Sequence, residues 1–244
     1  MNPTEFDLHA RLEDHHWWFR ARREIVFTLL KQTLAPSLSK HILEIGCGTG
    51  GNLRLLSQHY RATGIEIDPY AAKLAAQRAG CEIHCGDLAT TRQFIAHAPD
   101  AVLMLDVLEH VLDDRSLLLQ SLALLPVGGL LLITVPADPR LWSRHDIALG
   151  HYRRYTPDSL SALWRQQPAE VLLLSGFNSL LYPVVRLARA LPVRQATEAS
   201  DLKPVHPFLN TLLYQVFAAE RHLLPRISLP WGCSLIAILR KTTP

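Results

Sequence analysis

Short apolar runs and helix-compatible stretches alternate five times between residues 41 and 137. The run ILEI at 42–45, the run ending at Glu66 and the run that opens DAVLMLDVLEHV at 100–111 are rich in aliphatic residues, as buried strands are. Between the runs we expect helices over four segments, which are 49–60, 69–78, 89–97 and 113–125. Alternation of this kind predicts an α/β fold with a parallel sheet whose strands are joined by right-handed helical crossovers.

Two later apolar runs, AEVLLLSG at 169–176 and CSLIAILRK at 233–241, predict a sixth and a seventh strand. The segment between them is too long for a simple connector. It contains two amphipathic stretches, and the first, FNSLLYPVVRLARAL, is followed closely by Arg194 and carries Arg186 and Arg189. We therefore expect a helical insertion at 177–231. Three roles remain open for it: its helices pack on their own protein, cover a lipid tail, or lie on an anionic membrane surface.

Near the start of the chain, an apolar stripe marked by Trp17, Ile25 and Leu29 predicts a helix over 12–34. Its HHWWFRARR segment is unusually dense in aromatic and arginine side chains for a simple packing helix. Two interpretations remain open. The helix covers the edge of the sheet with an arginine-rich solvent face, or residues 1–34 form a lid over the cofactor or the substrate.

The length of 244 residues and the hydrophobic content of 48% predict a single domain with its core at 35–176 and 232–241. The net charge is uneven, −3 over residues 1–143 and +6 over 144–244. A pI near 8.8 and the lack of a run of stacking aromatics argue against nucleic acid as a partner. Four cysteines without a disulfide framework, and no signal-peptide pattern, predict a cytoplasmic protein.

The segment ILEIGCGTGGN brings Gly46, Gly48 and Gly50 into one tight turn between a strand and a helix. Glycine permits a positive φ and a close approach of the backbone to a ligand, and the helix directs its free N–H groups into the same space. Gly46, Gly48 and Gly51 also satisfy the dinucleotide pattern GxGxxG. Glu44 favours a cationic ligand instead, because its carboxylate would repel a pyrophosphate.

Acidic side chains follow the next three expected strands. Glu66 lies about 20 residues past the first glycine, where doubly wound folds place an acid on the ribose hydroxyls. Asp87 ends the third strand, and Asp106 ends the fourth, just before a Leu-Glu-His tip. Because open α/β sheets bind ligands at the carboxyl ends of their strands, we expect these acids to face one ligand.

The motif ExGxGxG at 44–50, together with these acids, resembles the motifs of the class I S-adenosylmethionine-dependent methyltransferases. The resemblance covers about residues 25–176 and 233–241, and it implies a Rossmann-like seven-stranded sheet and S-adenosylmethionine as the cofactor. The segments HHWWFRARR and HDIALGHYRRYT look like a bacterial subgroup, methyltransferase type 11/12-like, that is associated with saccharide or lipid-linked glycan modification. The cofactor-binding residues implied are Glu44, Gly46, Cys47, Gly48, Gly50, Asn52, Glu66, Ile67, Asp87, Leu88, Leu105 and Asp106.

Histidines supply the candidate catalytic groups. Methyl transfer needs alignment above all, and it needs a base when the acceptor is a hydroxyl. His110 is the leading candidate because it follows the fourth strand, beside the expected methyl donor. His145, with Asp146 adjacent, and His151 are the reserve candidates.

Arginines and aromatic residues supply the candidate substrate contacts. Arg153 and Arg154 are expected to bind a phosphate or carboxylate on the substrate. The complete set of expected substrate contacts is Trp18, Arg22, Arg153, Arg154 and Tyr155.

A metal site is not expected. Asp106, Glu109 and His110 form DxxEH, which is similar to the ExxEH that holds a divalent ion in some O-methyltransferases, but here the first side chain is shorter. Many metal-free relatives also carry Leu-Glu-His. A second group, Cys81, His84 and Cys85, is better explained by alternating burial on a short strand.

The sequence thus predicts an S-adenosylmethionine-dependent methyltransferase, acting on oxygen of a small-molecule, saccharide or lipid-linked acceptor that bears an oxyanion. Two alternatives remain open. One is an NAD-dependent oxidoreductase, and the other is a catalytically silent module that binds cofactor or membrane. A peripheral position on the inner face of the membrane is the alternative to a purely cytoplasmic one.

Overall fold

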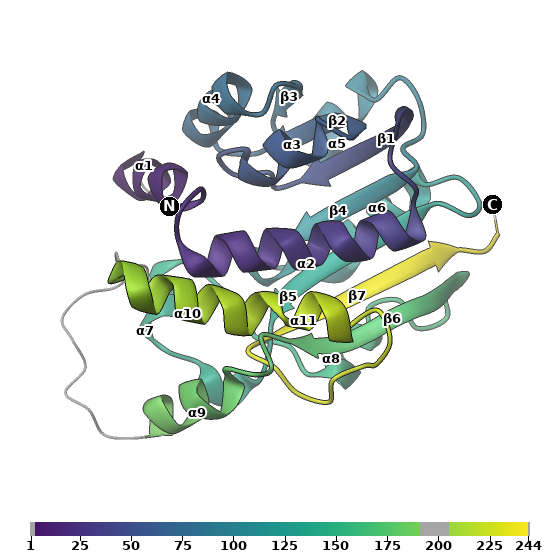
Figure 1. The fold of residues 1–244 in the computed structure, drawn as a ribbon. Coiled ribbons are helices and arrows are strands. Elements are labelled where there is room, and N and C mark those ends of the chain that lie inside the picture. Colours follow the sequence, from purple (N-terminus) through teal and green to yellow (C-terminus); the bar gives the residue numbers. More distant parts are fainter. Residues whose placement is uncertain (1–2, 191–204, 244) are drawn as a thin grey trace.

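The computed structural model describes residues 3–190 and 205–243. Its centre is one seven-stranded sheet with the order β3-β2-β1-β4-β5-β7-β6 (Figure 1). Within this sheet β7 runs antiparallel to both neighbours, and the other strands are parallel to one another. The predicted Rossmann-like sheet is confirmed. The strands are β1 (Ser37–Ile45), β2 (Tyr60–Glu66), β3 (Glu82–Cys85), β4 (Ala101–Leu105), β5 (Leu130–Pro136), β6 (Ala169–Phe177) and β7 (Ser234–Lys241).

The crossover helices follow the expected pattern, with shorter bounds in three cases. Helix α4 (Pro69–Arg78) has the bounds that the sequence predicts. Helix α3 (Gly51–Leu56) starts later than predicted because Gly50, at φ 84°, still belongs to the turn. The next crossover divides into α5 (Leu88–Thr91) and the 3-10 turn η1 (Arg92–Phe94), and α6 spans Asp114–Leu124.

Short helical turns shape the loops at the carboxyl ends of β4 and β5. The loop after β4 contains the 3-10 turn η2 (Leu108–His110). The loop after β5 contains η3 (Pro139–Leu141), α7 (Arg144–Ala148) and α8 (Pro157–Ser161). These loops therefore reach the edge of the sheet where doubly wound folds bind their ligands.

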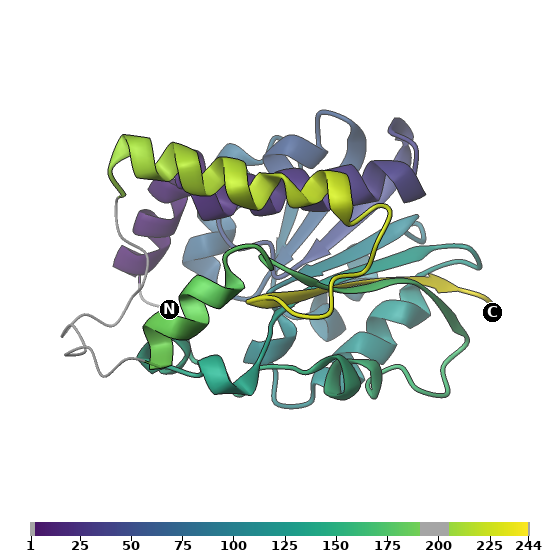
Figure 2. The same cartoon turned by 60° about the horizontal axis from the view of Figure 1, so that its bottom comes forward.

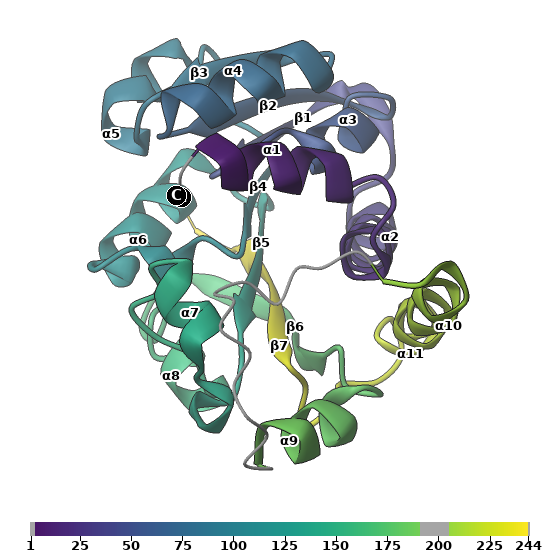
Figure 3. The same cartoon turned by 90° about the vertical axis from the view of Figure 1, so that its left-hand side faces the viewer.

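The N-terminal region contains two helices where the sequence predicts one. They are α1 (Pro3–Leu12) and α2 (Trp17–Thr33). The break has a local cause: the backbone of His16 is extended, and its Nδ1 accepts a hydrogen bond from the N–H of Trp18 at 3.3 Å, so His16 caps α2. Figure 3 shows α1 in front of the strand ends, next to α4.

The insertion between β6 and β7 contains α9 (Tyr182–Ala190), α10 (Pro207–Ala218) and α11 (Glu220–Leu223). Helix α10 lies beside α2 (Figures 1 and 2), and Asn210 accepts a hydrogen bond from the N–H of Trp17 at 2.8 Å. Helix α9 instead exposes Val184 and Leu187. Arg194 lies outside the described residues. Among the described helices, none has the length and apolarity that crossing a bilayer requires.

Both faces of the sheet are covered, so its strands alternate between two cores rather than between core and water. Ile42 belongs to one apolar cluster with Ile25 of α2 and Phe217 of α10. Its neighbour Leu43 belongs to a second cluster with Leu118 of α6. The carboxyl ends of the parallel strands are thereby held in a fixed arrangement beneath the N-terminal region.

Candidate active site

The turn between β1 and α3 has three glycines in the left-handed region, Gly46 at φ 69°, Gly48 at φ 56° and Gly50 at φ 84°. The N–H groups of Gly46 and Cys47 donate to the carbonyl of Ile65 at 2.8 and 3.0 Å, which ties the turn to β2. A Cβ added to Gly48 would meet no atom of residues 3–190 or 205–243 within 4 Å. The turn therefore borders open space, as a ligand cradle does.

Glu44 lies behind this turn and is 1% exposed. Its Oε1 accepts a hydrogen bond from Asn52 Nδ2 at 2.8 Å, whereas Oε2 is buried and has no hydrogen-bond partner within the described part of the chain. Burial raises the pKa of Glu44 to about 7. A buried carboxylate oxygen without a partner is costly, and a cationic ligand beside it would offset that cost. The Glu44 carboxylate therefore fits an ammonium-bearing ligand better than a pyrophosphate.

Glu66 ends β2 directly beside the glycine turn. Its Oε2 accepts from the N–H of Gly48 at 2.8 Å, and its Oε1 accepts from the N–H of Asp68 at 3.0 Å. The following side chain, Ile67, is 69% exposed. An acid suited to ribose hydroxyls and an exposed apolar side chain suited to a ring are thus adjacent at the turn.

Asp87 occupies the end of β3 as expected, and its carboxylate caps α5. It accepts hydrogen bonds from the N–H of Thr90 at 2.8 Å and from Thr90 Oγ1 at 2.7 Å. These hydrogen bonds lower the pKa of Asp87. Leu88 beside it is buried. The contact of Asp87 and Leu88 with the cofactor stays a prediction.

Asp106, at the end of β4, forms an ion pair with Arg22 of α2, with 2.6 Å between Oδ2 and Nη2. Thr134 Oγ1 donates to the other oxygen of Asp106 at 3.2 Å. The guanidinium of Arg22 also lies 5.1 Å from the centre of the Trp18 ring. The preceding residue of β4, Leu105, is part of the hydrophobic core. A largely buried ion pair therefore joins α2 to the strand end. Trp18 and Arg22 lie near the expected cofactor, and their contact with substrate stays a prediction.

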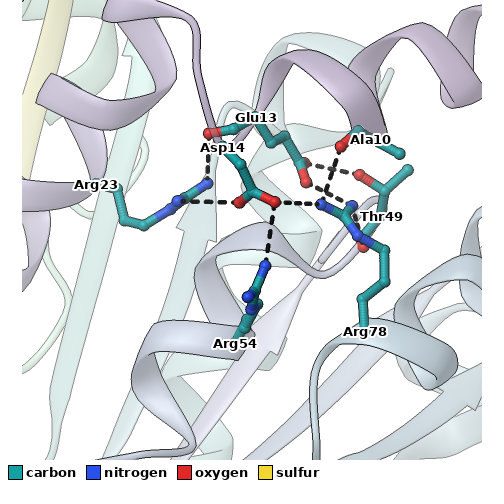
Figure 4. Close-up of polar contacts among 7 residues, drawn as sticks. All are labelled: Ala10, Glu13, Asp14, Arg23, Thr49, Arg54 and Arg78. Carbon is teal, nitrogen blue, oxygen red and sulfur yellow. Dashed lines mark hydrogen bonds and ion pairs between the residues drawn. The ribbon is translucent and has the colours of Figure 1, made fainter.

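The segment between α1 and α2 is fixed to the glycine turn by the ionic cluster in Figure 4. Glu13 accepts from Thr49 Oγ1 at 2.7 Å and from Arg78 Nη1 at 2.8 Å. Asp14 pairs with Arg54 at 3.1 Å. This position supports the interpretation of the N-terminal region as a lid, which stays a proposal. The sequence does not reveal the cluster because Glu13 and Arg78 are distant in the chain.

Glu109, His110 and His151 form a polar centre at the carboxyl ends of β4 and β5. The two imidazole rings meet edge to face with centroids 4.6 Å apart, and Tyr152 N–H donates to the carbonyl of Glu109 at 2.7 Å. Although part of His110 is open to solvent, desolvation by the surrounding protein and repulsion from His151 lower the pKa of His110 to about 4. Burial and then the Asp106 carboxylate raise the pKa of Glu109 well above its ordinary value.

Asp146 orients His151, not the adjacent His145 as its sequence position suggests. Its Oδ1 accepts from His151 Nδ1 at 3.1 Å and from Arg154 Nε at 2.8 Å, and its Oδ2 accepts from the N–H of Ser143 at 2.8 Å. Burial opposes ionisation of Asp146, but hydrogen bonds from His151 and Arg154 hold its pKa well below the ordinary value. Asp146 is therefore a fixed anion behind His151.

Arg154 and Tyr155, two of the expected substrate contacts, already have partners within the protein. The side chain of Arg154 is 9% exposed and its guanidinium is occupied by Asp146. Tyr155 is buried, and its hydroxyl donates to Asp114 at 2.7 Å. Arg153 also pairs with Asp114, at 2.9 Å. These side chains satisfy carboxylates of their own protein and fix the loop after β5, and their contact with an oxyanion on the substrate stays a prediction.

The family assignment follows from the comparison with known proteins. A family model described as "Methyltransferase domain" matches residues 17–174, which is more than half of the chain. The chain therefore belongs to this methyltransferase family, and its fold and glycine turn are those of the class I S-adenosylmethionine-dependent enzymes. It is a methyltransferase whose cofactor is S-adenosylmethionine, so the NAD-dependent alternative is wrong.

Among curated relatives, the chain is 29% identical over 195 residues to a ubiquinone biosynthesis O-methyltransferase of Ruegeria sp. strain TM1040, covering 69% of this chain and 76% of the relative. It is 24% identical over 205 residues to the O-methyltransferase cnsE of Penicillium expansum, covering 77% and 74%. The solved structure of the N-methyltransferase NodS from Bradyrhizobium japonicum WM9, in complex with S-adenosyl-L-homocysteine, superposes with a TM-score of 0.58 at 18% identity, covering 95% and 90%. At this identity the likeness is one of fold.

Glu66→Ala is expected to weaken binding of S-adenosylhomocysteine by about 1 to 3 kcal/mol, because two ribose hydroxyls lose a charged acceptor and the N–H of Gly48 loses its partner. Isothermal calorimetry measures the change. Glu82→Ala is the matched control, since Glu82 is exposed on the neighbouring strand β3. Equal affinities of the two variants would mean that Glu66 does not contact the ribose.

Proposed function

We propose that the protein transfers the methyl group of S-adenosylmethionine to an oxygen atom of a saccharide, a lipid-linked molecule or another small acceptor that bears an oxyanion. One observation carries the proposal. The centre of Glu109, His110 and His151 lies at the carboxyl ends of the parallel strands, as the glycine turn does. The names of the two curated relatives, both O-methyltransferases, favour oxygen as the acceptor atom.

In this proposal the histidine centre receives the acceptor hydroxyl. S-adenosylmethionine supplies an electrophilic methyl group, so the protein has to align the acceptor oxygen and assist the loss of its proton. His110 presents the more exposed imidazole, and His151 is held beside it by Asp146. In the simplest form of the reaction, one imidazole nitrogen of this pair accepts the proton.

The surroundings of α9 support an acceptor with an apolar portion. Tyr182, the first residue of α9, donates its hydroxyl to Asp138 at 2.6 Å, which anchors α9 to the chain just after β5. Helix α9 exposes Val184 by 67% and Leu187 by 63%, and it carries Arg186 between them. An apolar and basic surface thus begins near the carboxyl end of β5, close to the centre of Glu109, His110 and His151. Such a surface would suit a lipid-linked, anionic acceptor.

A labelled-donor screen tests the proposed function. Purified protein is incubated with S-adenosylmethionine that carries an isotopically labelled methyl group and with fractionated cell extract, and labelled products are identified by mass spectrometry. We expect a labelled methyl ether on an anionic product, recovered mainly in the lipid or saccharide fraction. Label on nitrogen or carbon, or in a neutral and purely water-soluble product, would contradict the proposal.

The surface of α9 also leads us to expect binding to anionic vesicles. Exposed apolar side chains enter the interface, and each basic residue near an anionic surface contributes about 1 kcal/mol. Co-sedimentation should be stronger with anionic than with neutral vesicles and should weaken with salt. The double variant Val184→Glu/Leu187→Glu should lose most of the binding.

Val127→Glu is the control for the vesicle experiment. Val127 is 56% exposed, but it precedes β5 and so lies at the opposite end of that strand from Asp138. Its replacement adds one negative charge away from α9, where the double variant adds two, and should leave sedimentation unchanged. Equal, salt-insensitive sedimentation of all three proteins would show that α9 covers a smaller acceptor and does not bind membrane.

A further inference from the structure

Three side chains of metal-binding type converge at the carboxyl ends of β4 and β5. Glu109, His110 and His151 each place one ligand atom within 4.8 Å of the other two. The backbone hydrogen bond from Tyr152 to Glu109 holds the two contributing loops together. We propose that these three residues bind one divalent transition-metal cation, and that Asp146 fixes the orientation of His151 for this purpose.

The hydrogen bond between Asp146 and His151 determines which imidazole nitrogen is available. Asp146 is fully buried and also accepts hydrogen bonds from Ser143 and Arg154, so it is an ionised acceptor. The proton of His151 therefore lies on Nδ1, which leaves the lone pair of Nε2 free. Histidines that bind metals commonly have this arrangement, in which a carboxylate accepts from the other ring nitrogen.

Glu109 supplies an independent indication of a ligand. Its side chain is 1% exposed, and its Oε2 is buried without a hydrogen-bond partner among the described residues. A carboxylate oxygen in such a position loses its hydration and gains nothing in return. A cation between Glu109 and the two histidines would provide the missing partner.

The donor set favours Zn²⁺, Co²⁺ or another first-row transition metal over Mg²⁺ or Ca²⁺. Two imidazoles and one carboxylate suit these metals, whereas Mg²⁺ and Ca²⁺ prefer oxygen ligands. Asp106 is already paired with Arg22, so the set differs from the DxxEH group in the sequence. Distances of about 2.0 to 2.2 Å from the cation require the ligand atoms to draw closer, which a rotation of the exposed His110 side chain permits.

Three protein ligands leave a coordination position for an exogenous oxygen, as in catalytic zinc sites. The role of the site in catalysis rests on the proposed function, whereas the binding of the cation does not. A cation there would polarise the acceptor hydroxyl and make it more acidic. Both imidazoles would then serve as ligands, and the acceptor proton would pass to water.

Direct metal binding tests this inference on the full-length protein after removal of metals with a chelator. Calorimetric titrations with Zn²⁺, Co²⁺ and Mg²⁺ should show one site for Zn²⁺ and Co²⁺ and no comparable binding of Mg²⁺. The visible absorption of the Co²⁺ protein should indicate four or five ligands including nitrogen. Glu109→Gln and His151→Ala should each reduce the affinity at least tenfold, while His84→Ala, which removes a histidine beside Glu82 at the sheet edge, should not.

Asp146→Asn tests the positioning role. The affinity for Co²⁺ should fall about 10- to 100-fold, and the Co²⁺ spectrum should shift, because the carboxylate no longer fixes the His151 ring. Circular dichroism identifies a variant that fails to fold, and the wild-type titrations then decide alone. Absence of stoichiometric Zn²⁺ or Co²⁺ binding to the wild type would overturn the inference, and so would equal binding by His151→Ala.

The outcome is independent of the labelled-donor screen. Methyl transfer that persists in chelator, by a protein that binds no metal, would remove the metal site and leave the proposed methylation, with an imidazole as base. Stoichiometric metal binding without transfer of label to oxygen would retain the site and remove the proposed acceptor chemistry.

Discussion

Gly48→Val is expected to abolish the binding of S-adenosylmethionine and S-adenosylhomocysteine. Gly48 has φ 56°, where a β-branched side chain is strained, and a Cβ at this position would project into the open space beside the turn. The added side chain would therefore occupy the cofactor's volume as well as strain the backbone. Calorimetry with S-adenosylhomocysteine should show no heat of binding where the wild-type protein gives a clear isotherm.

Gly128→Val separates the two effects. Gly128 has φ 83°, and an added Cβ there would also meet no atom of the described residues within 4 Å. It lies in the turn before β5, at the end of the sheet opposite to the expected cofactor site. The backbone strain costs of order 1 to 3 kcal/mol of stability at either position. Gly128→Val should therefore lower the melting temperature and retain the cofactor affinity. Equal loss of binding in both variants would attribute the effect to unfolding.

The fold could be predicted because each element has local sequence signals that agree with its tertiary role. Pro69 follows the capping residue Asp68, and α4 begins and ends where its sequence pattern does. The glycine turn carries its own conformational requirement, so Gly46, Gly48 and Gly50 could be assigned to it without knowledge of the remaining chain. The glycine turn was therefore accessible from the sequence, and the cofactor contacts of its residues stay a prediction.

The centre of Glu109, His110 and His151 was harder to predict from the sequence, because its geometry depends on contacts between segments that are distant in the chain. Adjacency in the sequence pairs Asp146 with His145, but the carboxylate turns toward His151 on the next loop. Arginines in HYRRY have the composition of an anion site, yet Arg154 neutralises Asp146 inside the protein. Composition shows that charges are present, and only the folded arrangement shows which carboxylates they already satisfy.

The N-terminal region shows the same limit in a different form. Its apolar stripe gives the register of α2 correctly, but not the break at His16, which arises from a capping hydrogen bond to Trp18. Glu13 and Asp14 fall in that break and pair with Arg78 and Arg54 on the glycine-turn side. A helical pattern of apolar residues shows which face of that helix is buried. It does not show which distant residues the polar side chains beside the helix will contact.

His110→Ala is expected to lower the turnover number by roughly 100-fold and to leave cofactor affinity nearly unchanged. The imidazole lies in the centre that we propose receives the acceptor oxygen, whereas the expected cofactor contacts lie mainly on β1, β2 and their turns. The measurement is single-turnover transfer of labelled methyl to the acceptor found in the extract screen, with S-adenosylhomocysteine affinity determined in parallel. A parallel loss of cofactor affinity would place His110 in the cofactor site.

His151→Ala should cause a loss of similar size, because His110 and His151 form one centre with their rings in contact. The double variant should then be little worse than either single variant, since residues that act as a unit show strongly non-additive losses. His145→Ala is the matched control: it removes a histidine from the same loop, but the adjacent Asp146 serves His151, so turnover should stay near the wild-type value. Additive losses at His110 and His151, or a loss at His145 as large as that at His151, would mean that the pair does not act on the acceptor together and that the loop contributes in some other way.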